Sequence, residues 1–201
     1  TGVSLGSSAS VTLSSSTAAP NDVITCEVTV SDTLGDSVSG SAQLTIGNRA
    51  PTAPTVSITP SSANTLDLLT ANVSDSTDLD NDSIVYSYAW YQNSTLTSNT
   101  TDYLDFSETS AGETWTVRVT PNDGYEDGSY TEASITIENS EPTISSVSIT
   151  PNSSVYNDSV LTCSATASDE DETVTPTYEW TVGSNSYSGA SLDLATTTAL
   201  P

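Results

Sequence analysis

The stretch "TWTVRVTPND", residues 114–123, decides the fold of this chain. Apolar and polar side chains alternate along it, and the apolar ones are Trp115, Val117 and Val119. Because successive side chains of a strand point to opposite faces, this alternation predicts a strand with one buried face and one solvated face. Such strands are typical of antiparallel sheets that cover a core on one side.

The stretch has a counterpart 91 residues earlier, "VITCEVTVSD" at residues 23–32. The same spacing relates "LTIGNRAP" at residues 44–51 to "ITIENSEP" at residues 135–142, and it relates the "VSITP" that begins at Val56 to the one that begins at Val147. Separate segments that share one period predict an internal repeat.

The period places repeat boundaries near residues 48–51 and 139–142, where prolines stiffen the connections. Neither end of the chain then holds a whole repeat, so each end needs further strands to bury its apolar face. The predicted parts are the C-terminal part of one repeat at 1–48, a complete repeat at 49–139, and the N-terminal part of a further repeat at 140–201.

Period-two alternation also predicts the other strands of the complete repeat, and no stretch has the apolar periodicity of a helix. About seven short strands in about 90 residues predict an all-β fold, an antiparallel β-sandwich. The predicted strands are residues 55–59, 66–73, 84–91, 103–106, 114–120 and 129–137, with a weaker one at 95–97.

Cysteine and tryptophan positions make the sandwich more specific. In this strand order Cys163 lies on the second strand of a repeat, Trp180 on the third and Cys26 on the sixth. A cysteine, a tryptophan and a cysteine on these strands are the core signature of the immunoglobulin-type sandwich.

With these residues, the "D-x-D-x-D…Y-x-W" run, the "TPNDGYEDG" stretch and the "N-x-x-P" linker, the chain resembles a known family. It resembles the immunoglobulin-like or polycystin-type (PKD-like) tandem repeats of large secreted or cell-surface proteins of bacteria and archaea. The resemblance implies tandem immunoglobulin-like antiparallel β-sandwiches with short Pro-containing linkers. It also implies an extracellular or cell-surface location.

The resemblance bears on the two cysteines, because oxidising compartments favour disulfides. Cys26 and Cys163 lie in different partial repeats, so their implied disulfide partners lie outside the chain or in a neighbouring copy. Two buried free thiols are the alternative. The complete repeat has Ala71 and Val117 at the cysteine positions, so it is predicted to rely on packing around Trp90.

Two acidic loops are the candidate metal sites, each between the second and third strands of its repeat. Alternate carboxylates can converge on one point, and calcium prefers oxygen ligands. Residues 122–127 and Asn48 are expected to face the first loop, and Asn139 the second. A solvated loop that only makes the protein soluble is the alternative. The candidate ligands are Asp78, Asp80 and Asp82 in the first loop and Asp169, Asp171 and Glu172 in the second.

Composition narrows the function. The chain has 26 Asp and Glu against 2 Lys and Arg, a formal net charge of −24 and no His. Nucleic acid is therefore not an expected partner, since the phosphates would be repelled. Catalysis is not expected either, because there is no His for proton transfer and no Cys–His pair. No segment is apolar enough to span a bilayer, so no direct membrane span is expected.

The repeat with its Pro linkers predicts a structural segment of an extracellular filament, a stalk or a giant surface adhesin. The alternative is a ligand- or glycan-binding immunoglobulin-like module of a secreted protein that uses exposed aromatic side chains. The aromatic candidates are Tyr88, Tyr91, Tyr103 and Tyr125. N-x-S/T sequences mark glycosylation candidates at Asn72, Asn81, Asn93, Asn99, Asn152 and Asn157.

The expected partners are further copies of the repeat, joined either covalently in one polypeptide or head to tail between chains. Residues 11–13 and 192–194 both resemble the fifth strand of a repeat, in segments that end at Pro20 and Pro201. One sandwich has room for one fifth strand, so this surplus favours the covalent array.

Overall fold

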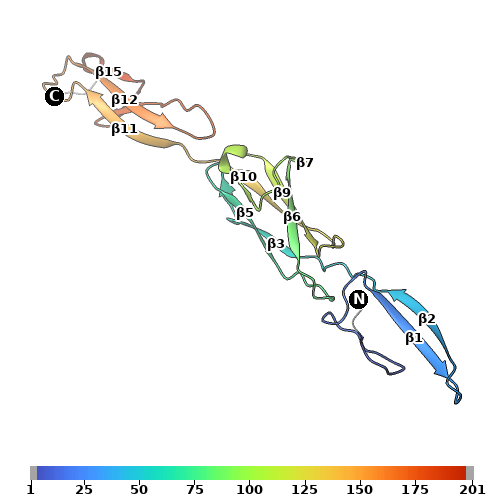
Figure 1. The fold of residues 1–201 in the computed structure, drawn as a ribbon. Coiled ribbons are helices and arrows are strands. Elements are labelled where there is room, and N and C mark those ends of the chain that lie inside the picture. The colour runs from blue at the N-terminus through green and yellow to red at the C-terminus, as the bar shows by residue number, and fades with distance from the viewer. Residues whose placement is uncertain (1–3, 198–201) are drawn as a thin grey trace. The chain divides into compact units, whose positions relative to one another are not determined.

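The computed structural model describes residues 4–197 and shows an all-β chain with two short 3₁₀ helices, η1 (Phe106–Glu108) and η2 (Leu194–Thr196) (Figure 1). The predicted partial repeats include residues 1–3 and 198–201, and these, with the predicted repeat end at Pro201, lie outside the described residues. Within the described residues, no helix has the length and hydrophobicity needed to cross a membrane.

The complete repeat supplies eight strands. They are β3 (Thr55–Thr59), β4 (Ala63–Asn64), β5 (Leu69–Ser74), β6 (Val85–Gln92), β7 (Thr95–Leu96), β8 (Tyr103–Leu104), β9 (Thr114–Asn122) and β10 (Thr131–Glu138). One sheet has the order β3-β5-β8 and the other has the order β4-β10-β9-β6-β7. This is an immunoglobulin-like β-sandwich, as predicted, with the second and third strands of the repeat in different sheets.

The alternation in residues 114–120 is confirmed, because Trp115, Val117 and Val119 on β9 are all buried. In the register of β6 and β9, Trp90 pairs with Val117. Trp90 is completely buried, and its indole Nε1–H donates to the Thr101 carbonyl at 2.9 Å. The predicted packing around Trp90 is therefore present, and its one polar atom is satisfied.

Of the predicted strands, two are shortened most, for local reasons. The strand expected at 66–73 begins at Leu69, because Asn64 and Asp67 close a turn in which the Asp67 carboxylate accepts the Asn64 N–H at 2.9 Å. The strand expected at 103–106 ends at Leu104, because Asp105 caps η1 by accepting the Ser107 N–H at 2.9 Å.

The prediction of a strand at residues 11–13 is wrong, because no strand is assigned there. In the complete repeat the fifth strand, β8, pairs with β5, with Leu69 opposite Leu104. Residues 4–22 contain no counterpart of β5, so residues 11–13 have no strand edge to join. The other predicted fifth strand, at 192–194, is present as β15 (Ser191–Asp193).

The partial repeats supply complementary strands. The first has β1 (Val23–Ser31) and β2 (Ser37–Thr45), which pair antiparallel over nine positions. The last has the sheet β11-β12-β15 and the pair β13–β14. The bounds of these strands are β11 (Thr143–Thr150), β12 (Val160–Ser168), β13 (Glu179–Val182) and β14 (Asn185–Ser188).

The strands of the last repeat correspond to those of the complete repeat. Ile149 pairs with Cys163 as Ile58 pairs with Ala71, and Leu161 pairs with Leu192 as Leu69 pairs with Leu104. By the same registers, β11, β12, β13, β14 and β15 match β3, β5, β6, β7 and β8. The strands β1 and β2 match β9 and β10 at the 91-residue spacing.

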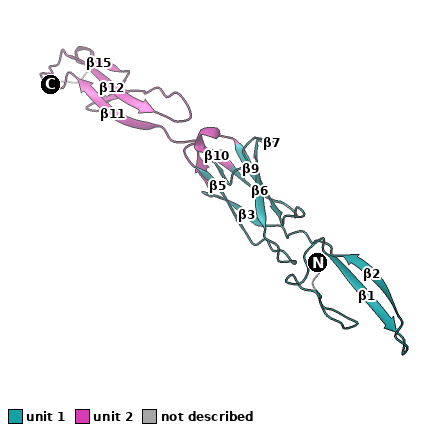
Figure 2. Cartoon of the chain, in the orientation of Figure 1, with its two compact units in different colours: residues 1–61, 68–104, 114–135 teal, residues 62–67, 105–113, 136–201 magenta. Residues whose placement is uncertain are grey.

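The chain divides into two compact units (Figure 2). The first contains residues 1–61, 68–104 and 114–135, and the second contains residues 62–67, 105–113 and 136–201. In the first, the core is formed by Leu69, Trp90, Leu104, Val117, Val119 and Pro121. In the second, β4 runs parallel to the end of β10 and pairs Ala63 with Ile137, both of which are buried. The repeat boundaries inferred from the sequence stay a prediction.

Candidate functional site

The first acidic loop lies between β5 and β6, as predicted, and folds around one carboxylate. The Asp78 side-chain oxygen Oδ1 accepts the backbone N–H of Asp80 at 2.7 Å and that of Asp82 at 3.3 Å. The loop turns at Asn81, whose φ of 62° is in the left-handed region that Asn tolerates. This fold brings one oxygen from each of Asp78, Asp80 and Asp82 within 4.8 Å of one another. All three predicted residues are therefore brought together.

The linker that precedes the complete repeat is bonded to this loop through Arg49. The Arg49 backbone N–H donates to Asp80 Oδ2 at 2.9 Å, and its guanidinium forms an ion pair with Asp80 Oδ1. The same guanidinium donates to the Leu79 carbonyl at 2.9 Å. Sequence reasoning missed this contact. The signal was that one of only two basic residues in the chain sits in the linker beside an acidic loop.

A second loop, between β9 and β10, holds the same linker. Asn48 Nδ2 donates to Asp123 Oδ2 at 2.9 Å, so the expected approach of Asn48 to residues 122–127 is observed. Asp123 is only 5% exposed, and its Oδ1 accepts the backbone N–H groups of Tyr125 and Glu126 at 2.8 and 2.7 Å. Asp123 therefore serves as a buried acceptor for the linker.

Glycine 128 lets the linker approach this loop closely. A Cβ atom at Gly128 would stand 2.3 Å from the Pro51 carbonyl oxygen and 2.9 Å from the Pro121 side chain. Distances under 3.0 Å are incompatible with a real Cβ. The close contact between linker and loop thus requires a glycine at this position.

Three side-chain oxygens at this junction are buried without a hydrogen-bond partner. They are Asn48 Oδ1, Asp78 Oδ2 and Asp82 Oδ2. Leaving a buried polar atom without a hydrogen bond is unfavourable, and more so for a charged group. Such atoms require an explanation, and three acceptors together match the oxygen ligands that a hard cation takes.

Electrostatics distinguish the carboxylates. Burial, followed by the charges of Asp78, Asp123 and Asp80, raises the pKa of Asp82. The hydrogen bond from the Arg49 side chain is the main cause of the lowered pKa of Asp80. Burial opposes ionisation of Asp123, but the hydrogen bonds from Asn48, Glu126 and Tyr125 outweigh it and the pKa is lowered. Asp82 is thus the carboxylate whose charge the protein alone compensates least.

The second acidic loop repeats part of this arrangement. The Ser140 backbone N–H donates to Asp171 Oδ2 at 2.5 Å, as Arg49 does to Asp80, and Asp171 N–H donates to Asp169 Oδ1 at 2.7 Å. Glu172 N–H also donates to Asp169 Oδ1, at 3.1 Å. Asn139 donates to the Ser140 carbonyl, not to a carboxylate.

The carboxylates of this second loop do not form a three-ligand group within residues 4–197. At the 91-residue spacing, the position of Asp82 is occupied by Thr173. The third carboxylate of this loop, Glu172, instead follows Asp171 directly, and cation binding at this loop stays a prediction.

The two cysteines have no disulfide partner within the described residues. Cys26 is exposed on β1, and Cys163 is half-buried on β12. Trp180 is buried on β13, and its Nε1–H donates to the Gly189 carbonyl at 2.8 Å, as Trp90 does to Thr101. Both tryptophans thus occupy matching core positions.

The candidate aromatic residues have different surroundings. Tyr88 and Tyr91 are half-buried on β6, and Tyr91 lies 5.0 Å from the Arg118 guanidinium, measured to the ring centroid. Burial raises the pKa of Tyr88. Tyr103 on β8 and Tyr125 in the β9–β10 connection are exposed. The two β6 tyrosines therefore serve packing on the sheet.

The glycosylation candidates also differ. Asn72 and Asn81 use their Nδ2 groups in hydrogen bonds, to Thr59 Oγ1 and to Ser15 Oγ respectively. The side-chain oxygens of Asn93 and Asn99 accept backbone N–H groups. The remaining two, Asn152 and Asn157, are exposed. Glycosylation of all six stays a prediction.

Comparison with known proteins adds little to this description. The sequence matches no family model and no curated protein. Among solved structures, the crystal structure of the chicken CNTN1 FN1–FN3 domains aligns with 84% of this chain at 11% identity and a TM-score of 0.35. This chain spans 63% of the length of that one. The immunoglobulin-like fold therefore rests on the strand order and registers given above, and not on this alignment.

Proposed function

We propose that this chain is a structural segment of a tandem array of immunoglobulin-like repeats in an extracellular filament, stalk or giant surface adhesin. The observation that supports this role is the way in which the complete repeat holds its linker. Asn48 and Arg49 are each bonded to a different loop of the sandwich, and Pro51 packs against Gly128. A repeat that fixes its own entry linker is suited to a load-bearing or spacing role.

We further propose that calcium binds at this junction. The ligands would be the three unpartnered oxygens of Asn48, Asp78 and Asp82, with Asp80 close to them but neutralised by Arg49. Calcium takes six to eight oxygen ligands, so carbonyls or waters would complete the set. When bound, the ion would neutralise the buried negative charge and join the linker to the loop.

The donor chemistry favours calcium over a transition metal. The three groups are two carboxylates and an amide, all hard oxygen donors, and the chain has no His. Carboxylate and carbonyl oxygens suit calcium and magnesium, whereas imidazole and thiolate suit zinc and copper. Magnesium demands near-ideal octahedral geometry, which an entirely loop-built site meets less easily than calcium coordination.

The test measures linker order and metal dependence in one chain. Backbone ¹⁵N relaxation should give residues 48–50 and Thr52 order parameters near 0.85 with calcium, like the rigid sandwich. Thermal unfolding should move to lower temperature when a chelator is added. Order parameters below about 0.6 in this linker with calcium present would contradict the structural role. A melting curve that does not change when chelator is added would contradict calcium binding, but it would not contradict the linker contacts.

A further inference from the structure

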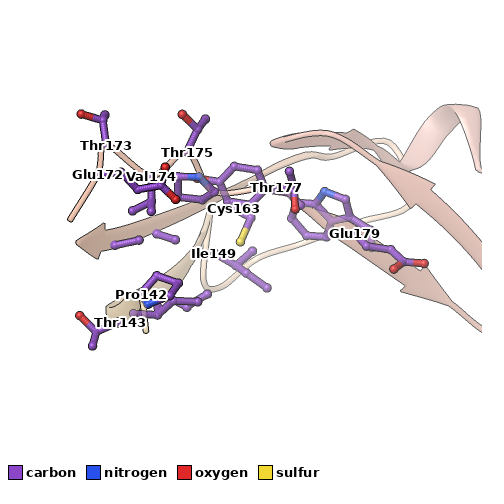
Figure 3. A pocket seen from close by; sticks show the side chains of 17 residues that line it. Pro142, Thr143, Ile149, Cys163, Glu172, Thr173, Val174, Thr175, Thr177 and Glu179 are labelled. Atoms are coloured by element: carbon purple, nitrogen blue, oxygen red, sulfur yellow. The ribbon is translucent and has the colours of Figure 1, made fainter. Parts of the chain in front are cut away.

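The last repeat has an open apolar groove of about 690 Å³ between β11, β12 and residues 172–180. Figure 3 shows Cys163 beside Ile149 among the side chains that line it. Its apolar lining includes Ile144, Val147, Ile149, Cys163, Ala165 and Trp180. Ile149 is 48% exposed, whereas its counterpart Ile58 in the complete repeat is only 8% exposed. The groove is therefore the half of a sandwich core over which residues 4–197 place no covering strands.

The strands that cover this core in the complete repeat are β9 and β10. Their counterparts, β1 and β2, form an isolated hairpin with an uncovered apolar face. Val28 is 59% exposed, whereas Val119 at the matching position of β9 is fully buried. The register places two pairs of this face opposite one another, Ile24 with Leu44 and Val30 with Val38, and leaves Cys26 and Val28 opposite the small residues Ala42 and Gly40. The members of this face are Ile24, Cys26, Val28 and Val30 on β1, and Val38 and Leu44 on β2.

Donor and acceptor together contain counterparts of every strand of the complete repeat except the two-residue strand β4. The last repeat has the counterparts of β3, β5, β6, β7 and β8, and the hairpin has those of β9 and β10. The register of the complete repeat then predicts the docking geometry. Because Trp90 pairs with Val117, β1 should pair with β13 so that Cys26 lies opposite Trp180.

The cysteines provide an independent indication that these two halves belong together. Cys163 is at the position of Ala71, which is buried in the β3-β5-β8 sheet, and Cys26 is at the position of Val117, which is buried in the other sheet. These are the positions that an inter-sheet disulfide joins in immunoglobulin-type sandwiches. The complete repeat, which closes by itself, has neither cysteine.

We propose that the β1–β2 hairpin of one chain docks into this groove of a second copy, and that a disulfide then forms between Cys26 of one copy and Cys163 of the other. The proposal rests on the structural role given above and names its partner. The expectation of a surplus fifth strand argued against this assembly. Residues 11–13 form no strand in this chain, and β15 already pairs with β12 at the place of the fifth strand.

The disulfide step needs an oxidant, and a low-molecular-weight disulfide such as oxidised glutathione serves. One sulfur–sulfur bond forms between Cys26 and Cys163, and one breaks in glutathione disulfide. The two cysteines lose two protons and two electrons in total, and glutathione leaves as two thiols. Exchange proceeds through a thiolate, which requires that Cys26 be accessible, and it is exposed.

The experiment uses the 201-residue chain in three forms: wild type, Cys26→Ser and Cys163→Ser. Each is incubated with oxidised glutathione, alkylated and separated by non-reducing electrophoresis. Wild type should give a ladder of multimers that a reductant collapses. Each single variant alone should remain monomeric, because it lacks one partner. An equimolar mixture of the two variants should give a dimer and no higher species.

A second pair of variants separates docking from random collision of thiols. Val28→Asp places a charge on the apolar face of β1 and should abolish the ladder. Thr29→Asp places the same charge on the opposite face of β1 and should leave the ladder intact. Cleavage after acidic residues followed by mass spectrometry should recover the Cys26 peptide linked to the Cys163 peptide.

Several outcomes would overturn the proposal. Wild-type monomers with free thiols would mean that the groove is filled by something other than a second copy. Disulfide dimers in either single variant, or a ladder that persists in Val28→Asp, would show unspecific thiol pairing. A monomer without free thiols would record a disulfide within one chain. The linker and calcium measurements, made in the Cys26→Ser, Cys163→Ser double variant, remain valid in every case.

Discussion

The complete repeat and the last repeat share five matching strands in corresponding registers, but only the complete repeat is closed. Ile58 and Ile149 are equivalent, and they differ in exposure sixfold, 8% against 48%. The difference comes from β9 and β10, which cover the core and also supply the loop that contains Asp123 and Gly128. Closing the sandwich therefore buries the core and also creates the contacts that hold the preceding linker.

The largest effect on stability is expected when the core tryptophan of each repeat is replaced. Trp90→Ala should destabilise the complete repeat by about 3–5 kcal/mol, because it leaves a large cavity in a closed core. Trp180→Ala should cost much less, since its groove is already open to solvent. The free energies of unfolding of both variants are measured by chemical denaturation, with the fluorescence of the remaining tryptophans as the signal. Equal losses would mean that closure does not determine the stability of these repeats.

The second test concerns Gly128. Gly128→Ala should cost about 1–3 kcal/mol, because the new methyl group would overlap the Pro51 carbonyl and the chain must shift to relieve it. The last repeat has no counterpart of this contact within the described residues. Gly40→Ala is the control, since a Cβ there would meet nothing within 4 Å. A Gly128→Ala protein that melts like wild type would show that the linker is not held at this point.

The third test concerns the charge of Asp82, whose effect on the melting temperature should have opposite signs with and without calcium. Its pKa is raised by folding, so its contribution stabilises below the unfolded-state pKa and is lost as the pH rises through the folded-state pKa. At neutral pH with chelator, Asp82→Asn should therefore raise the melting temperature. With calcium the same change should lower it, because a ligand is removed.

Acidification provides a check on this explanation. The gain from Asp82→Asn in chelator should vanish below the ordinary Asp pKa of about 3.9, where both states are protonated. Asp80 and Asp123 have lowered pKa values, so their contributions act in the opposite direction and are lost as the pH falls. Asp102→Asn, at an exposed carboxylate away from the junction, should change neither curve. If Asp82→Asn shifts the melting temperature in the same direction with and without calcium, Asp82 is not a calcium ligand.

The smallest expected effect comes from giving the first linker the sequence of the second at one position. Arg49→Ser gives the first linker the residue found at Ser140, while the backbone N–H bond to Asp80 is retained. Exposed ion pairs contribute little to stability, so the melting temperature should hardly change. Calcium affinity should rise, because Asp80 is freed from its guanidinium. Calorimetric titration measures this, and an unchanged affinity would mean that the Arg49–Asp80 pair has no influence on the cation site.

The strand pattern, the repeat and the core positions could be predicted from the amino-acid sequence alone. Alternation in residues 114–120, the 91-residue spacing and the places of Trp90 and Trp180 all follow from local side-chain periodicity, which any strand must obey when one face is buried. The sequence also located the first acidic loop and the approach of Asn48 to the loop at residues 122–127. These features depend on residues that are close in sequence or that repeat at a fixed interval.

Which residues complete the junction site, and which of the predicted strands form, could be seen only in the three-dimensional structure. Residues 11–13 have strand-like sequence but no neighbouring edge, and a strand needs hydrogen-bond partners that lie elsewhere in the chain. Arg49 and Asp80 are 31 residues apart, and Asn48 and Asp123 are 75 apart. Local periodicity carries no information about such pairs, because the turn geometry of two distant loops and the close approach at Gly128 bring them together.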